Sequence, residues 1–585
     1  MLAYIDRVRK QRPFSSHEFW MWLIVIAGAL LRFALISHNW PSTNSDEAVM
    51  GLMAKHILVR GEHPIFYYGQ AYMGPLEAYV GAILFAIFGV STLTLRLGLI
   101  LFFAIFVVCM YYLTRLLYNR QLALVTVGLL SLGSVDMLLH QLRGIGGYPE
   151  IVAFAALIFF IASHLALTAD QAQQANIGNV QRRRWLEFAV LGLLAGLAIW
   201  DDQLILPWVF LAAVLLFLFC RHELRRVSGV CVLFGLLIGA SPIIYYNITA
   251  PTGQSSIEIL AALQHAGAAQ IAQQHITLLS NISGTLLVGL PAITGFNPTC
   301  AATNLPFLGQ ATPQMLLCTA LQGGWTLGYF VLWVSAACLA GYIIWRHWQQ
   351  WKQNHDHAFT REERDNYVIQ WARLLLLLGG ILTMLSYITS PSSALVPGPT
   401  SRYLICVQLT IPAILWPLWN GFNRQKIVMV GGIRPLLILR IALLLFIELM
   451  FLLGTIRTFN QGTQDGLQQE QALIQYLESV GATRVYADYW NCYNLVFQSN
   501  ENILCTPLGD QLQPAQDRYP PYTRIIQSTY SPAYVFSKGA PQVALLEHDL
   551  RTLHIPYKYY AFADYVVYEP NDQLHKGIVM VSGNH

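Results

Sequence analysis

Charged residues are scarce in this 585-residue chain: only 11% are Asp, Glu, Lys or Arg, whereas 55% are hydrophobic. A soluble globular domain usually contains about a quarter charged residues, so this composition excludes an ordinary soluble protein and indicates a polytopic membrane protein. The net charge of +4 is small for the length and gives no reason to expect a nucleic-acid partner.

Several sequence signatures are also missing. There is no Walker loop, and the short basic connections leave no room for a nucleotide-binding domain. No Cys-x-x-Cys or Cys/His spacing predicts a zinc site. The basic N-terminus precedes an apolar run at residues 20–36, which no small-residue cleavage site follows, so we expect a retained signal anchor.

Long apolar runs predict eleven membrane spans. They lie near residues 20–37, 96–116, 122–140, 150–168, 186–200, 203–219, 229–246, 325–345, 372–389, 403–419 and 436–456. Every second connection carries a basic cluster: Arg7 to Arg12, Arg115 with Arg120, Arg182 to Arg184, Arg221 to Arg226, Arg346 with Lys352, and Arg424 with Lys426. Because Lys and Arg collect in cytoplasmic loops, we expect an inner- or plasma-membrane protein with its N-terminus cytoplasmic and its C-terminus outside.

Two apolar segments do not fit as spans. Residues 75–89 are too few to cross a bilayer, and residues 278–296 contain Gly and Pro, so we expect both to be interfacial or re-entrant on the external side. The predicted membrane domain is therefore residues 1–455, with external loops at about 38–95 and 247–324.

The remaining residues, 456–585, differ in kind. They contain strand-like runs at 482–490, 494–499, 532–537 and 564–570, and a helical stretch at 467–481. The predicted fold class is thus an α-helical polytopic membrane protein with a small C-terminal extracytoplasmic α/β domain. Either Cys300 with Cys318 or Cys492 with Cys505 could form a disulfide outside the cell.

Ionisable and polar residues gather in the predicted external connections. Charges at a membrane boundary cost free energy, so they are candidates for a functional site. They are Asp46, Glu47, Lys55, His56 and Gln70 in the first loop, Arg143 and Glu150 in HQLRGIGGYPE, Asp201 and Asp202 in WDDQ, and Arg402 before a late span.

Each candidate also has a structural interpretation. Asn44 with Glu47 resembles a capping box that opens the helix AVMGLMAKHIL. The aspartates of WDDQ could cap the next span, Arg402 could extend to the interface, and Arg143 could form a surface ion pair with Glu150. For the lone histidines His56 and His140, a structural role is the favoured interpretation. The residues alone leave these alternatives open.

A family resemblance adds weight to the functional interpretation. The chain resembles the GT-C glycosyltransferases of family 39 type, which include protein O-mannosyltransferases and aminoarabinose–lipid A transferases. The similar segments are the DE pair at 46–47, GPLEAYVGAILFAIFGVSTLTLRL at 74–97, the acidic Glu150 and the RYL at 402–404, with the eleven-span layout and the external C-terminal domain.

The resemblance implies an inverting transfer of a sugar from a polyprenyl-phosphate donor to a hydroxyl of a glycan, lipid or protein acceptor outside the cell. A hydroxyl needs a base, which would be Asp46. Glu47 is the second catalytic candidate, although helix capping is its favoured role. The leaving phosphate needs a cation instead. The expected phosphate ligands are Arg402, Arg143 and Lys55, and the residues expected to contact sugar or tune Asp46 are Glu150, Asp201, Asp202, Gln70 and His56.

One departure concerns the cofactor. The usual HPPL or EKPPL is MGPL at 73–76, so a carboxylate that binds metal in some relatives is missing, and Gln70 is a poor metal ligand. No cofactor is certain, and a divalent cation is left open.

Two other classes compete with this prediction. A transporter or lipid flippase often has internal repeats and polar groups at mid-membrane, whereas no repeated half is visible here and the ionisable residues lie at one surface. A non-catalytic scaffold would tolerate Asp46→Asn.

Overall fold

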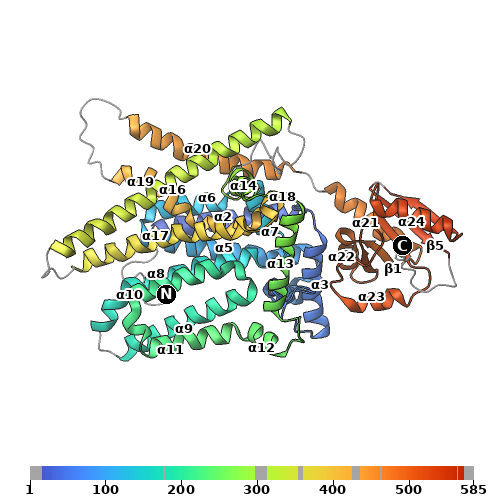
Figure 1. Ribbon diagram of the computed structural model, residues 1–585, viewed down its shortest axis with the longest axis horizontal. Helices are drawn as coiled ribbons and strands as arrows, with labels where there is room; N and C mark the ends of the chain where they lie inside the picture. The colour runs from blue at the N-terminus through green and yellow to red at the C-terminus, as the bar shows by residue number, and fades with distance from the viewer. Residues whose placement is uncertain are drawn as a thin grey trace. The chain divides into compact units, whose positions relative to one another are not determined.

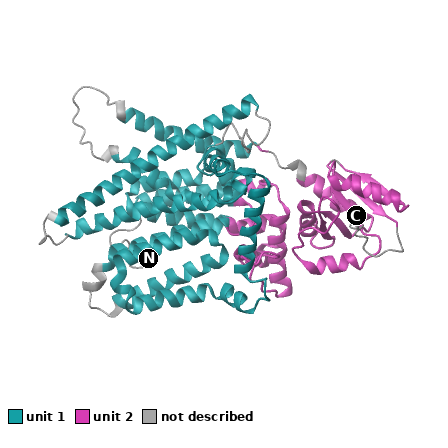
Figure 2. Cartoon of the chain, viewed as in Figure 1, with its two compact units in different colours: residues 1–32, 100–141, 148–460 teal, residues 33–99, 142–147, 461–585 magenta. Residues whose placement is uncertain are grey.

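The computed structural model describes residues 16–174, 178–296, 312–353, 360–423, 435–461, 464–562 and 564–571. Cys300, the cluster from Arg7 to Arg12 and the pair Arg424 and Lys426 lie outside these residues. The chain divides into two compact units (Figure 2). The helical unit comprises residues 1–32, 100–141 and 148–460, and the loop–sheet unit comprises residues 33–99, 142–147 and 461–585.

Helices make up nearly all of the described helical unit (Figure 1). Their bounds are α2 (Ser16–Ser37), α5 (Thr92–Leu117), α6 (Arg120–Ser131), α7 (Val135–Leu142), α8 (Tyr148–Gln174), α9 (Gly178–Asp201), η1 (Gln203–Ile205), α10 (Leu206–Leu224), α11 (Val227–Gly239), α12 (Ser241–Thr249), α13 (Ser256–Gln273), α14 (Leu278–Gly284), the π-helix η2 (Thr285–Gly289), α15 (Leu290–Ile293), α16 (Pro313–Gln353), α17 (Arg361–Ile388), α18 (Ser392–Leu395), η4 (Pro399–Thr410), α19 (Ile411–Asn423) and α20 (Pro435–Phe459).

The predicted multi-pass fold is confirmed. Within the described residues, eight helices are long and apolar enough to cross a membrane, or up to eleven if each of three bent pairs is one span. Two bent pairs, α6 with α7 and α11 with α12, match predicted spans. The predicted span at 186–200 lies in α9, which is not among the eleven because Arg184, Glu187 and Asp201 interrupt it.

The third bent pair takes in the second ambiguous segment. Helix α13 and the helices of residues 278–293 meet at 107°, which is compatible with a broken span or a re-entrant loop. The other ambiguous segment forms a single short apolar helix, α4 (Leu76–Phe88), that is too short to count as a span.

Glycines allow α9 and α11 to touch. A Cβ at Gly192 would lie 2.0 Å from the carbonyl oxygen of Val232, and one at Gly235 would lie 2.1 Å from that of Ala189. Gly196 and Gly239 repeat the contact one turn further along. Small residues four positions apart let two membrane helices approach until their backbones meet, and the two sequences here have this spacing.

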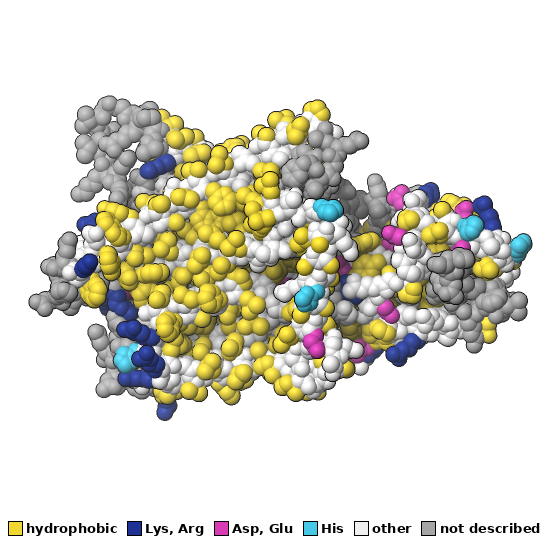
Figure 3. Space-filling view, viewed as in Figure 1, with side chains coloured by type: hydrophobic (Ala, Val, Ile, Leu, Met, Phe, Trp, Pro, Cys, Tyr) yellow, Lys and Arg dark blue, Asp and Glu magenta, His cyan; other side chains and the backbone are white. Residues whose placement is uncertain are grey.

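The outer surface of the helical unit is apolar. Its exposed side chains include Phe210, Phe217, Phe234, Leu327 and Val331. In the view of Figure 3, hydrophobic side chains cover most of this unit, and Lys and Arg gather at one end of it. A contiguous exposed apolar face of this extent is what a lipid-facing surface requires.

The loop–sheet unit joins the first predicted external loop to the C-terminal region. Its helices are α3 (Ser45–Arg60), α4, α21 (Gln464–Ser479), α22 (Tyr489–Gln498), α23 (Pro520–Gln527) and α24 (Pro541–Thr552). Its strands are β1 (Arg484–Asp488), β2 (Leu504–Leu508), β3 (Ala533–Ser537), β4 (Tyr557–Ala561) and β5 (Tyr565–Pro570), in the order β2-β1-β3-β5-β4. β1 pairs in parallel with β2 and β3, whereas β5 pairs antiparallel with β3 and β4.

One apolar core runs through this unit. Helix α22 packs on α3, where the ring of Phe497 fills the space that a side chain at Gly51 would need. A disulfide joins Cys492 to Cys505 at the edge of the sheet. The first predicted external loop is therefore folded together with the C-terminal α/β region.

One predicted strand is wrong. Residues 494–498 lie in α22 and Ser499 is its C-cap. The helix forms because Asp488 ends β1 and immediately caps the helix, accepting hydrogen bonds from the backbone N–H groups of Trp490 and Asn491 at 3.0 and 3.3 Å. The run of Leu495, Val496 and Phe497 is buried because the helix packs inside the unit.

The helix contact gives a first prediction. Gly192→Ala should lower the unfolding free energy by about 1–3 kcal/mol, because the added methyl forces α9 and α11 apart. Thermal unfolding of the purified full-length protein measures the change. Gly341→Ala in α16 is the control, since no atom lies within 4 Å of its Cβ. Equal unfolding temperatures for the two variants would contradict the close packing.

Candidate active site

The DE pair begins helix α3. Asn44, in an extended conformation, is the N-cap, and its side chain accepts a hydrogen bond of 3.0 Å from the backbone N–H of Glu47. Half of the predicted capping box is therefore present. The other half is not, because the Glu47 side chain binds elsewhere. The cap fixes where the helix starts and so fixes the position of Asp46.

Glu47 forms a buried ion pair with Arg96 of α5. The guanidinium donates to both carboxylate oxygens, from Nε to Oε1 at 2.7 Å and from Nη2 to Oε2 at 2.5 Å. The backbone N–H of Gly144 adds a third hydrogen bond to Oε1 at 3.1 Å. The side chains of Glu47 and Arg96 are 0% and 2% exposed, so this two-point pair holds the first turn of α3 rigidly.

Asp46 lies beside this pair but is partly open to solvent, with 19% of its side chain exposed. Its Oδ1 accepts a hydrogen bond from the Tyr489 hydroxyl and another, of 3.3 Å, from Nη2 of Arg518. Among the described residues, no group bonds Oδ2. One carboxylate oxygen is thus held in place while the other remains available.

Arg518 is the cation of this site. It is 4% exposed and donates from Nε to the Tyr489 hydroxyl at 2.8 Å. With its amide oxygen facing the guanidinium, Gln70 accepts from Nη1 and Nη2 at 3.0 and 3.2 Å. Burial alone would lower the pKa of Arg518, but the interactions with Tyr67, Tyr489 and Asp46 raise it, so the guanidinium stays charged.

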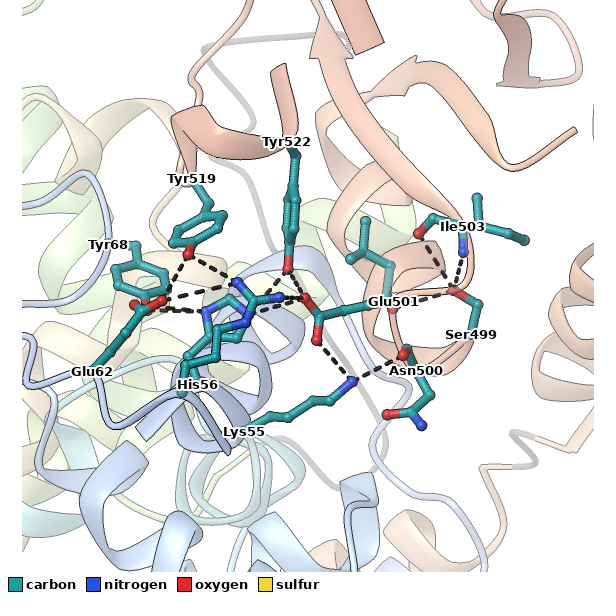
Figure 4. Close-up of polar contacts among 12 residues, drawn as sticks. Lys55, His56, Glu62, Tyr68, Ser499, Asn500, Glu501, Ile503, Tyr519 and Tyr522 are labelled. Carbon is teal, nitrogen blue, oxygen red and sulfur yellow. Dashed lines mark hydrogen bonds and ion pairs between the residues drawn. The ribbon is translucent and has the colours of Figure 1, made fainter. Parts of the chain in front are cut away.

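Lys55 and His56 belong to a different cluster (Figure 4). The fully buried ring of His56 contacts the Tyr68 hydroxyl at 3.0 Å through Nδ1, and Oε1 of Glu501 at 3.2 Å through Nε2. Lys55 pairs with Oε2 of Glu501 at 2.8 Å. The contacts of both residues therefore fasten α3 to the α/β region.

The remaining predicted residues are distributed over both units. Arg143, in the loop–sheet unit, donates to the carbonyl oxygen of Ser42 at 3.0 Å. Glu150, in the helical unit, is fully buried in the first turn of α8, and Asp201 is fully buried at the end of α9. Asp202 accepts from the backbone N–H of Leu204 at 2.9 Å, so its predicted capping role is confirmed, for the helix η1.

Arg402 lies in an aromatic setting in η4. Its guanidinium carbon is 5.6 Å from the ring centre of Tyr148 and 5.4 Å from that of Tyr403. Tyr148 also interacts electrostatically with Asp202. Two of the predicted residues of the helical unit, Arg402 and Asp202, are thus grouped around one tyrosine.

The residues around Asp46 do not fit a divalent cation. The oxygens of Asp46, Gln70 and Tyr489 already surround the guanidinium of Arg518, whose positive charge a metal ion would have to oppose. Across the described residues, no group of three or more His, Cys, Asp or Glu side chains could hold a metal ion.

Sequence reasoning did not find Arg518 or the contact between Tyr489 and Asp46. Arg518 lies 472 residues from Asp46 and carries no local motif, so the sequence offers no signal for the pair. Of the aromatic residues near Tyr489 in the sequence, Tyr486 and Tyr493 are core residues, whereas Trp490 is 60% exposed.

Two solved structures share this fold over most of the chain. AglB, an archaeal oligosaccharyltransferase from Archaeoglobus fulgidus in complex with an inhibitory peptide and a dolichol-phosphate, matches with a TM-score of 0.50 and 14% identity, covering 94% of this chain and 74% of its own. ArnT from Cupriavidus metallidurans bound to undecaprenyl phosphate matches with a TM-score of 0.50 and 12% identity, covering 95% and 98%. The predicted GT-C fold class is therefore confirmed.

At these identities the likeness establishes the fold alone. No protein-family model and no curated protein sequence matches the chain.

The cluster around Glu501 predicts a pH dependence. Burial alone would raise the pKa of Glu501, but hydrogen bonds from His56, Lys55 and Tyr522 hold it well below its usual range. A carboxylate with a lowered pKa stabilises the fold above its unfolded pKa of about 4.3, and this contribution is lost as the pH falls further. Glu501→Gln should therefore lower the unfolding temperature at pH 7, and its difference from wild type should shrink below about pH 4.

Thermal unfolding of the full-length protein between pH 3 and 8 measures this difference. Glu478→Gln is the matched control, because Glu478 is exposed and its side chain accepts a surface hydrogen bond from Asn502, and such contacts contribute little. A difference for Glu501→Gln that stays constant across the whole pH range would contradict the lowered pKa.

Proposed function

We propose that the chain is an inverting glycosyltransferase that moves a sugar from a polyprenyl-phosphate donor to an acceptor hydroxyl on the extracytoplasmic face. The observation that carries the proposal is the carboxylate of Asp46, fixed at the start of α3 through one oxygen and open at the other. The fold shared with AglB and ArnT supports it, since the AglB structure contains a dolichol-phosphate and the ArnT structure contains undecaprenyl phosphate.

Asp46 is the general base of this reaction. Its Oδ2 takes the proton of the acceptor hydroxyl while the oxygen of that hydroxyl bonds to the anomeric carbon. The bond from that carbon to the phosphate oxygen breaks on the opposite side, which inverts the anomeric configuration without a covalent intermediate. Tyr489 and Arg518 position the carboxylate, and Glu47 positions it indirectly through the pair with Arg96.

The leaving group is a phosphate, which needs positive charge rather than a proton. Arg402 is our candidate for that role, because a guanidinium matches the geometry of phosphate oxygens and is less strongly hydrated than an ammonium. The same unit contains a cavity of about 510 Å³ with an apolar lining that includes Phe296, Trp325 and Phe446, which suits a prenyl chain.

The remaining candidates take lesser roles in this scheme. Gln70 positions Arg518, and Lys55 and His56 hold α3 in place. Glu150, Asp201, Asp202 and Arg143 are kept as residues that contact the donor or adjust the charge around it.

The extracytoplasmic orientation is part of the proposal. It is supported by the alternation of basic connections along the chain. The disulfide between Cys492 and Cys505 supports it as well, because disulfides persist in oxidising compartments.

Asp46→Asn should reduce sugar transfer by about 10²–10⁴-fold, since the amide cannot accept the proton. The assay measures transfer of label from a radiolabelled polyprenyl-phosphate sugar to acceptor supplied only outside sealed spheroplasts. Asp510→Asn is the control, because Asp510 is an exposed aspartate of the same unit that accepts only a hydrogen bond from Gln542. Wild-type transfer by Asp46→Asn would reject the base, and absence of transfer by the wild-type protein in opened membranes would favour a scaffold. Transfer to acceptor in opened membranes but not outside sealed spheroplasts would reject the orientation.

Arg402→Ala should weaken binding of undecaprenyl phosphate by about 10- to 100-fold, the effect of losing a charge-assisted hydrogen bond of about 1.5–3 kcal/mol. Binding to the purified full-length protein is measured by displacement of a fluorescent analogue. Arg225→Ala removes the same charge from an exposed position at the end of α10 and should leave the affinity unchanged. Unchanged affinity in both variants would remove Arg402 from the phosphate site.

A further inference from the structure

The loop–sheet unit contains a polar cavity of about 450 Å³ that the proposed chemistry does not use. It lies among the residues that precede α3, the start of α5, and the helices α21 and α22. Small-molecule sites typically enclose about 300–1,000 Å³, so the cavity is large enough for a ligand.

Two polar groups of this cavity have no hydrogen-bond partner within the described part of the chain. Glu470 of α21 is only 8% exposed and interacts electrostatically with Tyr565, but its carboxyl group makes no hydrogen bond or ion pair there. The side-chain oxygen of Asn494 is also buried without a hydrogen bond. Buried polar groups are nearly always hydrogen-bonded in native proteins, so these two point to a ligand with several hydroxyl groups.

The protonation of the Glu470 carboxyl group suits a ligand with several hydroxyl groups. Burial raises the pKa of its carboxyl to about 7, so the acid and the carboxylate coexist near neutral pH. The acid can donate to a hydroxyl oxygen and the carboxylate can accept from a hydroxyl group. Neither form requires a charged partner.

The other walls are amide and aromatic groups. The amide nitrogen of Asn491 donates to Asp488 and Ser537 at 2.6 and 3.0 Å, and that of Gln498 donates to Thr92 at 3.1 Å, which holds both amides in place. Trp490 contributes an indole that is 60% exposed. An aromatic face beside fixed amides matches a sugar ring, which has an apolar face and polar edges.

The charges of the cavity exclude other ligand classes. Its guanidinium, Arg96, is engaged by both oxygens of Glu47, so among the described lining residues no free cation neutralises an anionic ligand. A single carboxylate is too few ligands for a metal ion. The many amide and hydroxyl groups would be left unpaired by a hydrocarbon chain.

We propose that this cavity binds a neutral saccharide unit of the acceptor, and that the acceptor is therefore a glycan. The proposal rests on the proposed function, because it uses the same helices as the base. Asn44 lines the cavity two residues before Asp46, and Trp490 lines it directly after Tyr489. The Ser45 hydroxyl donates to the Trp490 carbonyl oxygen at 2.9 Å, which joins the two helix starts. A saccharide seated here extends toward the carboxylate that activates the next hydroxyl.

Binding is tested on a printed array of defined neutral and acidic oligosaccharides. The full-length protein is used in lipid nanodiscs, because maltoside detergents carry sugar headgroups of their own. Wild type should bind neutral oligosaccharides, and Glu470→Gln and Trp490→Ala should each weaken the apparent affinity at least tenfold. Glu478→Gln, an exposed glutamate on the same helix, should bind as wild type does.

Thermal unfolding separates loss of binding from loss of the fold. Glu470→Gln keeps the shape of the side chain and removes an unpaired buried carboxylate, so we expect no fall in unfolding temperature. Any of three results would overturn the proposal: the wild type does not bind the array, the two cavity variants bind as well as the wild type, or the wild type prefers acidic oligosaccharides.

The transfer assay distinguishes this failure from failure of the proposed function. Glu470→Gln should raise the acceptor KM at least tenfold with little change in kcat, whereas Asp46→Asn lowers kcat. Two outcomes reject the cavity proposal alone: the wild type transfers sugar and Glu470→Gln has the same acceptor KM, or the wild type transfers sugar to a peptide that carries no sugar. One outcome rejects the proposed function alone: the wild type binds saccharide, Glu470→Gln does not, and neither protein has transferase activity.

Discussion

The ion pair between Glu47 and Arg96 is the interaction on which the site depends. Burying two charges is unfavourable unless their geometry is good and their remaining hydrogen-bonding groups are satisfied. Here the guanidinium binds both carboxylate oxygens, and the Gly144 N–H adds a further bond. With the Asn44 cap, the pair determines where α3 begins and which way its first residues point. Asp46, one position earlier, owes its orientation to a neighbour with no proposed chemical role.

That constraint resolves the apparent conflict between capping and catalysis. Asp46 lies in the first turn of the helix, and Tyr489 and Arg518 both bond its Oδ1, so the carboxylate is held in one orientation. In the proposed reaction, that fixed orientation places Oδ2 beside the acceptor hydroxyl, and correct placement of reacting groups removes much of a reaction barrier.

The parts that sequence predicted well are those with a local signal. Apolar length revealed nearly all of the spans, and Asn44 followed three residues later by Glu47 revealed a helix start. The run at 494–499 was wrongly predicted as a strand. Its apolar residues, among them Val496 and Phe497, are buried in a helix, and six residues are too few to distinguish a buried helix from a buried strand. Arg518 was not predictable, since it reaches Asp46 only through the folding of the C-terminal region against the first loop.

The C-terminal region is thereby an integral part of the proposed site. It supplies Tyr489 and Arg518 to Asp46, and Glu470, Trp490 and Asn494 to the polar cavity. A fold shared with AglB and ArnT at 12–14% identity leaves such details free to differ. The helical unit contributes Arg402 and an apolar cavity, which suit a lipid phosphate whatever sugar it carries. In the proposed reaction, choice of acceptor falls to the loop–sheet unit, where a change of a few cavity side chains alters the preferred glycan without disturbing the base.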